Sequence, residues 1–182
     1  RAVGPFHAVE PDADASYSRE VVIHLDTLSP QVALPHQVDR VVEIQDARGT
    51  PMHMVYLGTC AGGRVSDFHQ ALEVLRAGGG VAAGVEVVVT PASREVLETL
   101  SRDGTLAEFV AMGAVVVTPG CGSCCGTCGA IPGDQVNVIS TANRNFKGRM
   151  GNSNAAIYLA SPASCAAAAV RGVITDPREI CS

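Results

Sequence analysis

The stretch VEVVVTPASREVLETLSRDGTLAEFVAMGAVVVT (residues 85–118) alternates two kinds of pattern. It opens with an apolar run at Val85–Thr90 and closes with another at Ala114–Thr118. Between them, Ser93–Gly104 is typical of a helix whose first serine is its N-cap, and Thr105–Gly113 predicts another short helix. Apolar strands that are joined by helices favour a parallel sheet.

The same alternation continues on both sides of this stretch. Further strands are predicted at Met52–Leu57, Gln135–Ser140 and Ala156–Ser161. Further helices are predicted at Arg64–Gly78 and at Ser161–Gly172, where a proline occupies the first turn. We therefore expect an α/β fold with a three-layer, mostly parallel sheet and helices on both faces.

The first fifty residues have a different character. They are rich in turn residues and contain no clear helix, and Val21–Asp26 and Val41–Asp46 are short strand candidates. We expect residues 1–50 to form an extended lead-in packed on the domain, and residues 51–182 to form the α/β domain itself.

Composition limits the class of protein. The chain has 182 residues, 47% of them hydrophobic and 17% charged, which is typical of a globular domain. The net charge of −5 and the lack of a Lys/Arg run argue against nucleic acid or an anionic membrane as a partner. With no signal-peptide core and no apolar run of membrane-spanning length, we expect a cytoplasmic protein. The first residue is not Met, so a processed or partial chain is one interpretation.

Three segments should lie at the carboxyl edge of the sheet, where parallel sheets form their sites. They are Gly58–Arg64, Pro119–Gly133 and Thr141–Asn154. The first two carry glycine-flanked cysteines, in LGTCAGG and in PGCGSCCGTCG. Three thiolates could converge there, from Cys60, Cys121 and Cys124, and thiolates are ligands for zinc or iron–sulfur clusters.

Other interpretations of the cysteines stay open at this point. A single C-x-x-C pair is also typical of a redox protein, and a buried cysteine is an ordinary small hydrophobic residue. Cys125 and Cys128 form a second pair of this spacing, which leaves the choice of ligands ambiguous. Cys165 lies in an alanine-rich helix and is expected in the core, whereas Cys181 lies in the tail.

The third segment, STANRNFKGRMGNSN, combines two arginines with side-chain amides. Guanidinium groups bind carboxylates through two parallel hydrogen bonds. Arg144 and Arg149, with Asn143 and Asn145 beside them, therefore predict a site for a di- or tricarboxylic acid. Arg64, directly after LGTCAGG, would add a third cation; the alternative is an exposed turn with solvated arginines.

The segments LGTCAGGR, PGCGSCCG and STANRNFKGRMGNSNAAIYLASPASCAAAAVRG together resemble the aconitase superfamily. They are most similar to the large subunits of 3-isopropylmalate dehydratase and homoaconitase, whose G-[ST]-C-T-N-[GS]-R, P-G-C-x-x-C and N-R-N-F-x-G-R segments occur in the same order. The resemblance spans about Pro11 to Pro177 and implies the fold of the aconitase iron–sulfur domain.

The resemblance also implies a chemistry for the site. It makes Cys60, Cys121 and Cys124 the ligands of a [4Fe–4S] cluster, and Asn143, Arg144 and Arg149 the residues that hold substrate carboxylates. The family reaction is the reversible dehydration and hydration of a β-hydroxy acid, in which the iron without a thiolate acts as a Lewis acid.

The chain departs from the family pattern in two respects. Ala61-Gly62 stands where Thr-Asn is usual, and CCGTC holds more cysteines than the family needs. The acid–base residues of the family are not found here, so we expect the chain to need other subunits or domains that carry them. The alternatives are a non-catalytic metal- or cluster-binding module, or a thiol redox protein.

Overall fold

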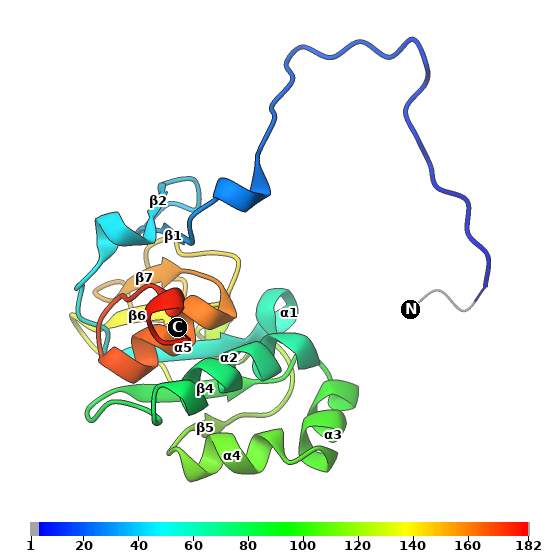
Figure 1. Ribbon diagram of the computed structural model, residues 1–182. Coiled ribbons are helices and arrows are strands. Elements are labelled where there is room, and N and C mark those ends of the chain that lie inside the picture. Colours follow the sequence, from blue (N-terminus) through cyan, green and yellow to red (C-terminus); the bar gives the residue numbers. More distant parts are fainter. Residues whose placement is uncertain (1–3, 182) are drawn as a thin grey trace.

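A computed structural model describes residues 4–181, and within them seven strands form one sheet (Figure 1). The spatial order of the strands is β2-β1-β7-β6-β3-β4-β5. Their bounds are Gln31–Ala33 (β1), Val41–Glu43 (β2), Met54–Gly58 (β3), Glu86–Thr90 (β4), Val115–Val116 (β5), Asn137–Ser140 (β6) and Ala156–Leu159 (β7).

Strand direction confirms the expected mostly parallel sheet. The five strands from β3 to β7 run parallel to one another, and β3 lies in the middle between β4 and β6. Strands β1 and β2 are antiparallel additions at the edge beside β7. The fold is therefore an α/β fold.

Apart from α1, which was expected to be a loop, the helices follow the predicted segments closely. They are Thr59–Gly62 (α1), Val65–Ala77 (α2), Arg94–Arg102 (α3), Thr105–Ala111 (α4) and Pro162–Arg171 (α5). Ser93 caps α3, as predicted, because its hydroxyl accepts a hydrogen bond from the backbone N–H of Val96 at 3.3 Å. Short 3₁₀ turns lie at Leu25–Thr27 (η1), Ile44–Ala47 (η2), Gly122–Cys125 (η3) and Pro177–Glu179 (η4).

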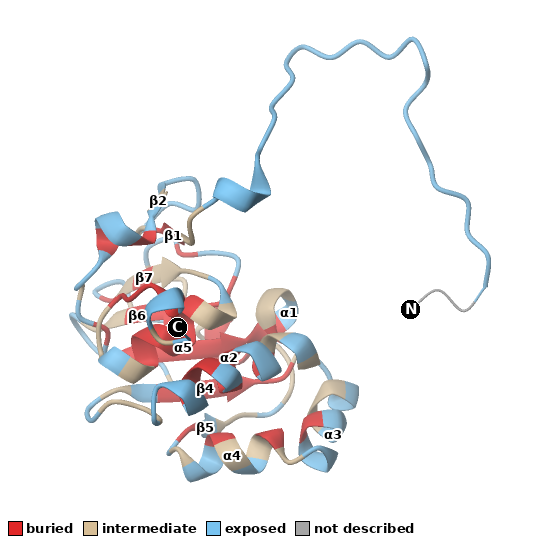
Figure 2. Ribbon diagram, in the orientation of Figure 1, coloured by how far each residue is buried: buried red, intermediate tan, exposed pale blue. Residues whose placement is uncertain are grey.

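One face of the sheet is covered by α2, α3, α4 and α5, and we name it the helical face. Its core contains alternate residues of the central strands, such as Val55 and Val87, packed against helix residues such as Phe68. The rings of Phe68 and Phe109 meet edge to face, with centroids 6.2 Å apart. Figure 2 shows this buried layer in red along β3, β4 and α5.

The opposite face is covered differently, and this corrects the expectation of helices on both faces. Here Met54, Tyr56 and Val88 pack against Cys124 and Met150, which belong to segments without an α-helix. We name this the loop face.

Chirality explains the difference between the faces. The chain moves in one direction across the sheet from β3 to β5, with its connecting helices on the helical face. It then returns to β6 and moves the opposite way to β7. Right-handed crossovers in that opposite direction pass over the other face. These connections are rich in glycine, and they cover the face as loops.

The first part of the chain only partly matches its prediction. Residues 4–28 are exposed throughout and run away from the sheet in Figure 1. The strand expected at Val21–Asp26 was wrong, because this segment is extended and then enters η1. The strand expected at Val41–Asp46 is β2 followed by η2, and β1 and β2 belong to the main sheet. The division of the chain at residue 50 stays a prediction.

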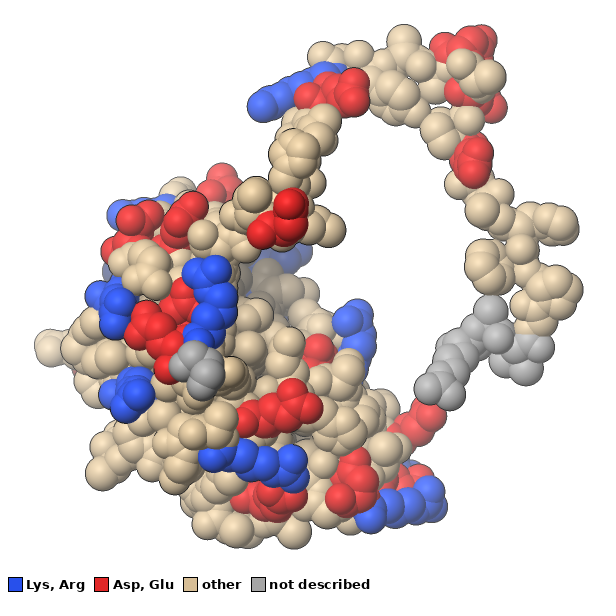
Figure 3. Space-filling model, in the orientation of Figure 1, with Lys and Arg blue, Asp and Glu red and all other residues tan. Residues whose placement is uncertain are grey.

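The charged residues are mixed on the surface that Figure 3 shows, with blue and red groups side by side. Some are paired, such as Arg76 of α2 with Glu108 of α4, and Arg102 with Glu98 within α3. In the part of the chain from Gly4 to Cys181, none of the helices has the length and apolar character needed to cross a membrane.

Candidate iron–sulfur and carboxylate site

The three predicted segments leave the sheet at the carboxyl ends of β3, β5 and β6. The chain moves from β3 toward β4 on one side, whereas β6 leads to β7 on the other, so the strand order reverses between β3 and β6. Such a reversal is where open α/β sheets bind ligands. Cys60 lies in α1 rather than in a loop, directly after β3.

The two residues that follow β4, Pro91 and Ala92, hold the two cysteine segments together. The backbone N–H of Ala92 donates to the carbonyl of Gly63 at 3.1 Å, just past α1. The carbonyl of the preceding residue, Pro91, accepts from the N–H of Gly120 at 3.0 Å, just before Cys121. The segments that carry Cys60 and Cys121 are therefore tied to adjacent positions of one strand end.

Thr141 ties the third segment to the first. Its hydroxyl accepts from the backbone N–H of Gly58 at 2.8 Å and lies 3.1 Å from the carbonyl oxygen of the same residue. The approach is close, because a Cβ at Gly62 would lie 2.4 Å from the Cβ of Thr141. The loop after β6 is thus fixed against the turn that precedes Cys60.

Tyr56, on β3, holds the cysteine segment by a hydrogen bond from its hydroxyl group. Its buried hydroxyl donates to the carbonyl of Cys121 at 3.0 Å and lies 2.9 Å from Oγ1 of Thr90. Burial raises the pKa of this phenol. A Cβ at Gly122 would lie 2.4 Å from the Tyr56 hydroxyl, so glycine is required for this contact.

The thiols themselves differ in exposure. Cys60 and Cys121 are exposed, whereas Cys124 is buried. The pKa of the Cys121 thiol is raised, because partial loss of hydration and then the neighbouring thiols of Cys125, Cys124 and Cys60 disfavour its thiolate form.

Arg149 faces the same thiols. Its Nη2 donates to Sγ of Cys124 at 3.5 Å, and this hydrogen bond raises the pKa of the guanidinium. Its guanidinium carbon also lies 5.6 Å from the ring centroid of Phe146. Its Nε is buried without a hydrogen-bond partner.

The other predicted carboxylate-binding residues are on the surface. Asn143, Arg144 and Arg64 are exposed, and Nη1 of Arg144 donates to the carbonyl of Asn143 at 2.6 Å. Asn145 is fully buried, and its Nδ2 donates to the carbonyl of Leu34 at 2.8 Å. Asn145 therefore anchors the loop to the strand β1 region.

Comparison with known proteins identifies the family. The model of the aconitase family (aconitate hydratase) matches residues 1–172. The chain belongs to the aconitase family.

Individual relatives of the family agree with this assignment. The chain is 48% identical to 3-isopropylmalate dehydratase large subunit 2 of Archaeoglobus fulgidus, over 97% of this chain and 42% of the relative. It is 47% identical to the homoaconitase large subunit of Thermus thermophilus, over 93% of this chain and 40% of the relative. The chain thus spans about two fifths of the length of these curated relatives.

Membership of the aconitase family suggests an iron–sulfur cluster, and the residues present fit such a group. Thiolates are its usual ligands, and they are gathered at one edge of the sheet. Three buried polar atoms have no hydrogen-bond partner: Oγ1 of Thr59 and Oγ of Ser123, which precede Cys60 and Cys124 in the chain, and Nε of Arg149, which contacts Cys124 through its Nη2. Among residues 4–181, no three His, Cys, Asp or Glu side chains form a group that could hold a single metal ion.

Sequence reasoning missed the residues that support the thiols, namely Tyr56, Thr90 and Thr141. One signal could have found two of them, because a threonine stands at the carboxyl end of β4 and another directly after β6. Both are buried, and a buried hydroxyl needs a partner.

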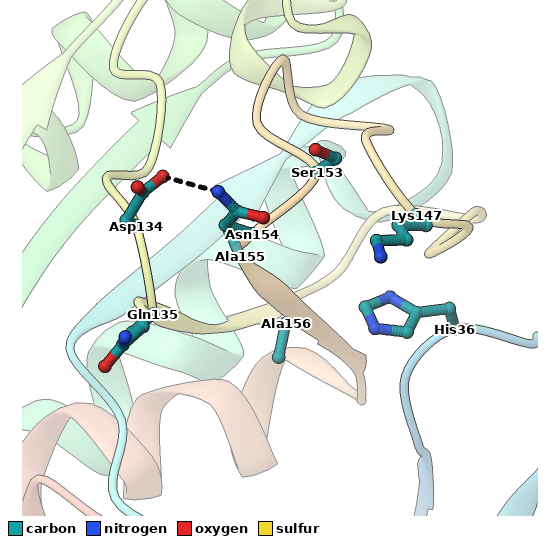
Figure 4. A pocket seen from close by; sticks show the side chains of 8 residues that line it. All are labelled: His36, Asp134, Gln135, Lys147, Ser153, Asn154, Ala155 and Ala156. Atoms are coloured by element: carbon teal, nitrogen blue, oxygen red, sulfur yellow. Dashed lines mark hydrogen bonds between the residues drawn. The ribbon is translucent and has the colours of Figure 1, made fainter.

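The third segment also contributes to a polar pocket away from the cysteines (Figure 4). Its lining includes His36 and Lys147, with Asp134 and Asn154 at the other side. The amide of Asn154 donates to Oδ1 of Asp134 at 3.2 Å. None of the cysteines lines this pocket, so it is separate from the thiols.

Proposed function

We propose that this chain is the cluster-binding part of an aconitase-like hydro-lyase, with Cys60, Cys121 and Cys124 as ligands of a [4Fe–4S] cluster. One observation carries the proposal. Cys60 and Cys121 come from separate connections of the sheet, yet the segments that carry them are hydrogen-bonded to two adjacent residues at the end of β4. The backbone bonds to Pro91 and Ala92 hold both segments in place.

The cluster, when bound, supplies a Lewis acid for the hydroxyl group of the substrate. The chain's own contribution is to orient the acid and to balance its charge. Arg149 lies against Cys124 and carries an N–H without a partner, so it is suited to a carboxylate oxygen. We assign Asn143, Arg144 and Arg64 to the remaining carboxylate contacts, at the exposed rim.

The substrate is proposed to be a β-hydroxy di- or tricarboxylic acid. The relatives are named for 3-isopropylmalate dehydratase and homoaconitase activity, and both names describe a large subunit. We assign no acid–base residue to this chain, so partner domains or subunits must supply the groups that move protons. We place the assembled protein in the cytoplasm.

Anaerobic reconstitution with iron and sulfide tests the ligand set. The parent chain should bind about four irons and four sulfides and absorb visible light. Single variants Cys60→Ser, Cys121→Ser and Cys124→Ser should each lose most of this iron. The matched controls Cys125→Ser, Cys128→Ser and Cys181→Ser should retain it. A parent that stays free of iron, or a control that loses it, would overturn the assignment.

A complementation assay tests the activity. The reconstituted chain is mixed with the polypeptides that copurify with it, and hydration of unsaturated di- and tricarboxylic acids is followed. Activity should need both components and should fall at least tenfold in Arg149→Met. Activity in the Cys124→Ser variant equal to that of the parent would contradict the role of the cluster.

A further inference from the structure

Four cysteines of the chain have no part in the proposed ligand set. Cys165 is fully buried in α5, where burial raises the pKa of its thiol. Cys181 is exposed near the end of the chain, away from the cysteine segment in sequence. Cys125 and Cys128 remain, and both lie in the segment that carries Cys121 and Cys124.

Cys125 and Cys128 share the same two neighbours. Their sulfur atoms lie 3.4 Å and 3.6 Å from the carbonyl oxygen of Gly122. They also lie 2.9 Å and 4.0 Å from Oγ1 of Thr127. Two sulfurs that contact the same carbonyl and the same hydroxyl are close neighbours on one side of the turn.

The backbone brings the two side chains together. Residues Gly122–Cys125 form η3, and Gly126 then takes a left-handed conformation with φ of 67° that reverses the chain. Glycine is needed here for a second reason, because a Cβ would lie 2.4 Å from the backbone nitrogen of Gly151. The reversal places the thiol at position 128 back over the turn that carries position 125.

The pair is more accessible than the buried ligand beside it. Cys128 is exposed and Cys125 is half-buried, whereas Cys124 is buried against Arg149. Both thiols are free in the structure. Reagents in solution therefore reach Cys128 without displacing the packing around Cys124.

We propose that Cys125 and Cys128 form a reversible disulfide by exchange with small-molecule disulfides of the glutathione class. The C-x-x-C spacing is one that disulfide oxidoreductases use. The pair contains none of the proposed ligands, so its exchange can be tested whatever the ligand set is; the expected effect on iron rests on the proposed function.

The exchange takes place in two steps. The thiolate of Cys128, which is the more exposed, attacks one sulfur of the small disulfide; a mixed disulfide forms and one small thiol leaves. The thiolate of Cys125 then attacks the Cys128 sulfur, the protein disulfide forms and the second small thiol leaves. Two protein thiols are oxidised while one small disulfide is reduced to two thiols, and the two protons pass to solvent or to the released thiolates.

The disulfide would change the ligand segment. Both sulfurs now contact the carbonyl of Gly122, which lies between Cys121 and Cys124 in the chain. Joining the sulfurs removes the thiol hydrogens that this carbonyl accepts. Oxidation of the pair is therefore expected to loosen η3 and to speed the loss of iron from the reconstituted chain.

The test is a redox titration of the purified chain, both free of iron and reconstituted. The chain is equilibrated without oxygen against mixtures of reduced and oxidised glutathione, quenched with acid, alkylated and mapped by mass spectrometry. Two thiols should be lost together at positions 125 and 128 and should be recovered on reduction. In the reconstituted sample, iron should leave at least threefold faster after oxidation.

Single variants assign the pair. Cys125→Ser should stop at a mixed disulfide on Cys128, and Cys128→Ser should form no internal disulfide. The control Cys181→Ser should behave as the parent does. Loss of thiols at Cys121 and Cys124 instead, a mixed disulfide that persists on Cys128 of the parent, or full retention of the free thiols at positions 125 and 128 would each overturn the proposal. The titration of the iron-free chain needs no cluster, so its failure is distinct from a failure of the proposed function.

Discussion

The helical face and the loop face of the sheet are held by different forces. On the helical face, side chains such as Phe68 and Leu75 are buried in one apolar core. On the loop face, the hydroxyls of Tyr56 and Thr141 make the decisive hydrogen bonds, and glycines allow the segments to touch. Apolar burial is non-directional, whereas a hydrogen bond or a glycine contact fixes one geometry.

This difference separates stability from ligand geometry. The helical face accounts for most of the buried apolar residues of the chain, so it should dominate the free energy of unfolding. The loop face positions the cysteines and Arg149, so small changes there should alter iron binding more than unfolding. Four substitutions test this comparison.

Phe68→Ala should have the largest effect on stability. The variant removes a buried ring and its edge-to-face contact with Phe109, which costs about 4 kcal/mol. Urea unfolding measures the loss, and the exposed helix residue Val110, changed to Ala, is the control with an expected change below about 0.5 kcal/mol. The iron bound per folded chain should stay near that of the parent. A selective loss of iron in folded Phe68→Ala would break the comparison.

Gly122→Ala should have the second-largest effect on stability. Unlike Phe68→Ala, it should also reduce the iron bound per folded chain. The new Cβ would collide with the Tyr56 hydroxyl, and the backbone φ of 52° is unfavourable for alanine, for a cost of about 3 kcal/mol in total. Iron retention after reconstitution should fall strongly. Gly113→Ala is the matched control, because it has φ of 86° with open space around it and should lose about 1 kcal/mol. Equal iron retention in the two variants would contradict the role of the contact.

The two faces also differ in how far sequence could predict them. On the helical face, the helices follow from the spacing of apolar residues and from the residues that cap helix ends. Helices α2, α3 and α5 begin within one residue of the predicted helices. The segments that cover the loop face have no such regular spacing of apolar residues. Helices were expected on both faces because apolar strands alternate with helices along the chain. The glycine-rich composition of Pro119–Gly133 and Thr141–Asn154 was the sign that loops would cover it instead.

The candidate site shows the same limit. Strand ends placed Cys60, Cys121 and Cys124 at one edge, because parallel strands finish on the same side. The partners of these segments could not be read from spacing. Tyr56 lies in an apolar strand and looks like a core residue, and only the register of β3 with β4 brings its hydroxyl to Thr90 and Cys121.

Tyr56→Phe should have a smaller effect than the glycine variant. It leaves the carbonyl of Cys121 without this donor, and the expected loss of stability is about 1–2 kcal/mol. Iron should be lost faster from the reconstituted variant, because the Cys121 segment is less firmly held. Tyr158→Phe on β7 is the control, with a change within about 0.5 kcal/mol. If both variants release iron at the parent rate, Tyr56 does not position the segment.

The smallest effect is expected for Asp176, at the margin of the helical face. Its buried carboxylate accepts from the guanidinium of Arg178, which lowers the carboxyl pKa below its ordinary 3.8. A lowered folded pKa stabilises the protein above pH 3.8, and this contribution is lost as the pH falls through the folded pKa.

Urea unfolding at pH 7 should therefore find Asp176→Asn less stable than the parent, by less than Tyr56→Phe. The difference in stability between the two proteins should shrink as the pH falls below 3.8, because the other carboxylates titrate alike in both proteins. Arg178→Met keeps the Asp176 carboxylate but removes its partner. As the pH falls, this variant should therefore begin to lose stability at a higher pH than the parent does. A constant difference between Asp176→Asn and the parent from pH 7 to pH 3 would show that the cost is packing and not charge.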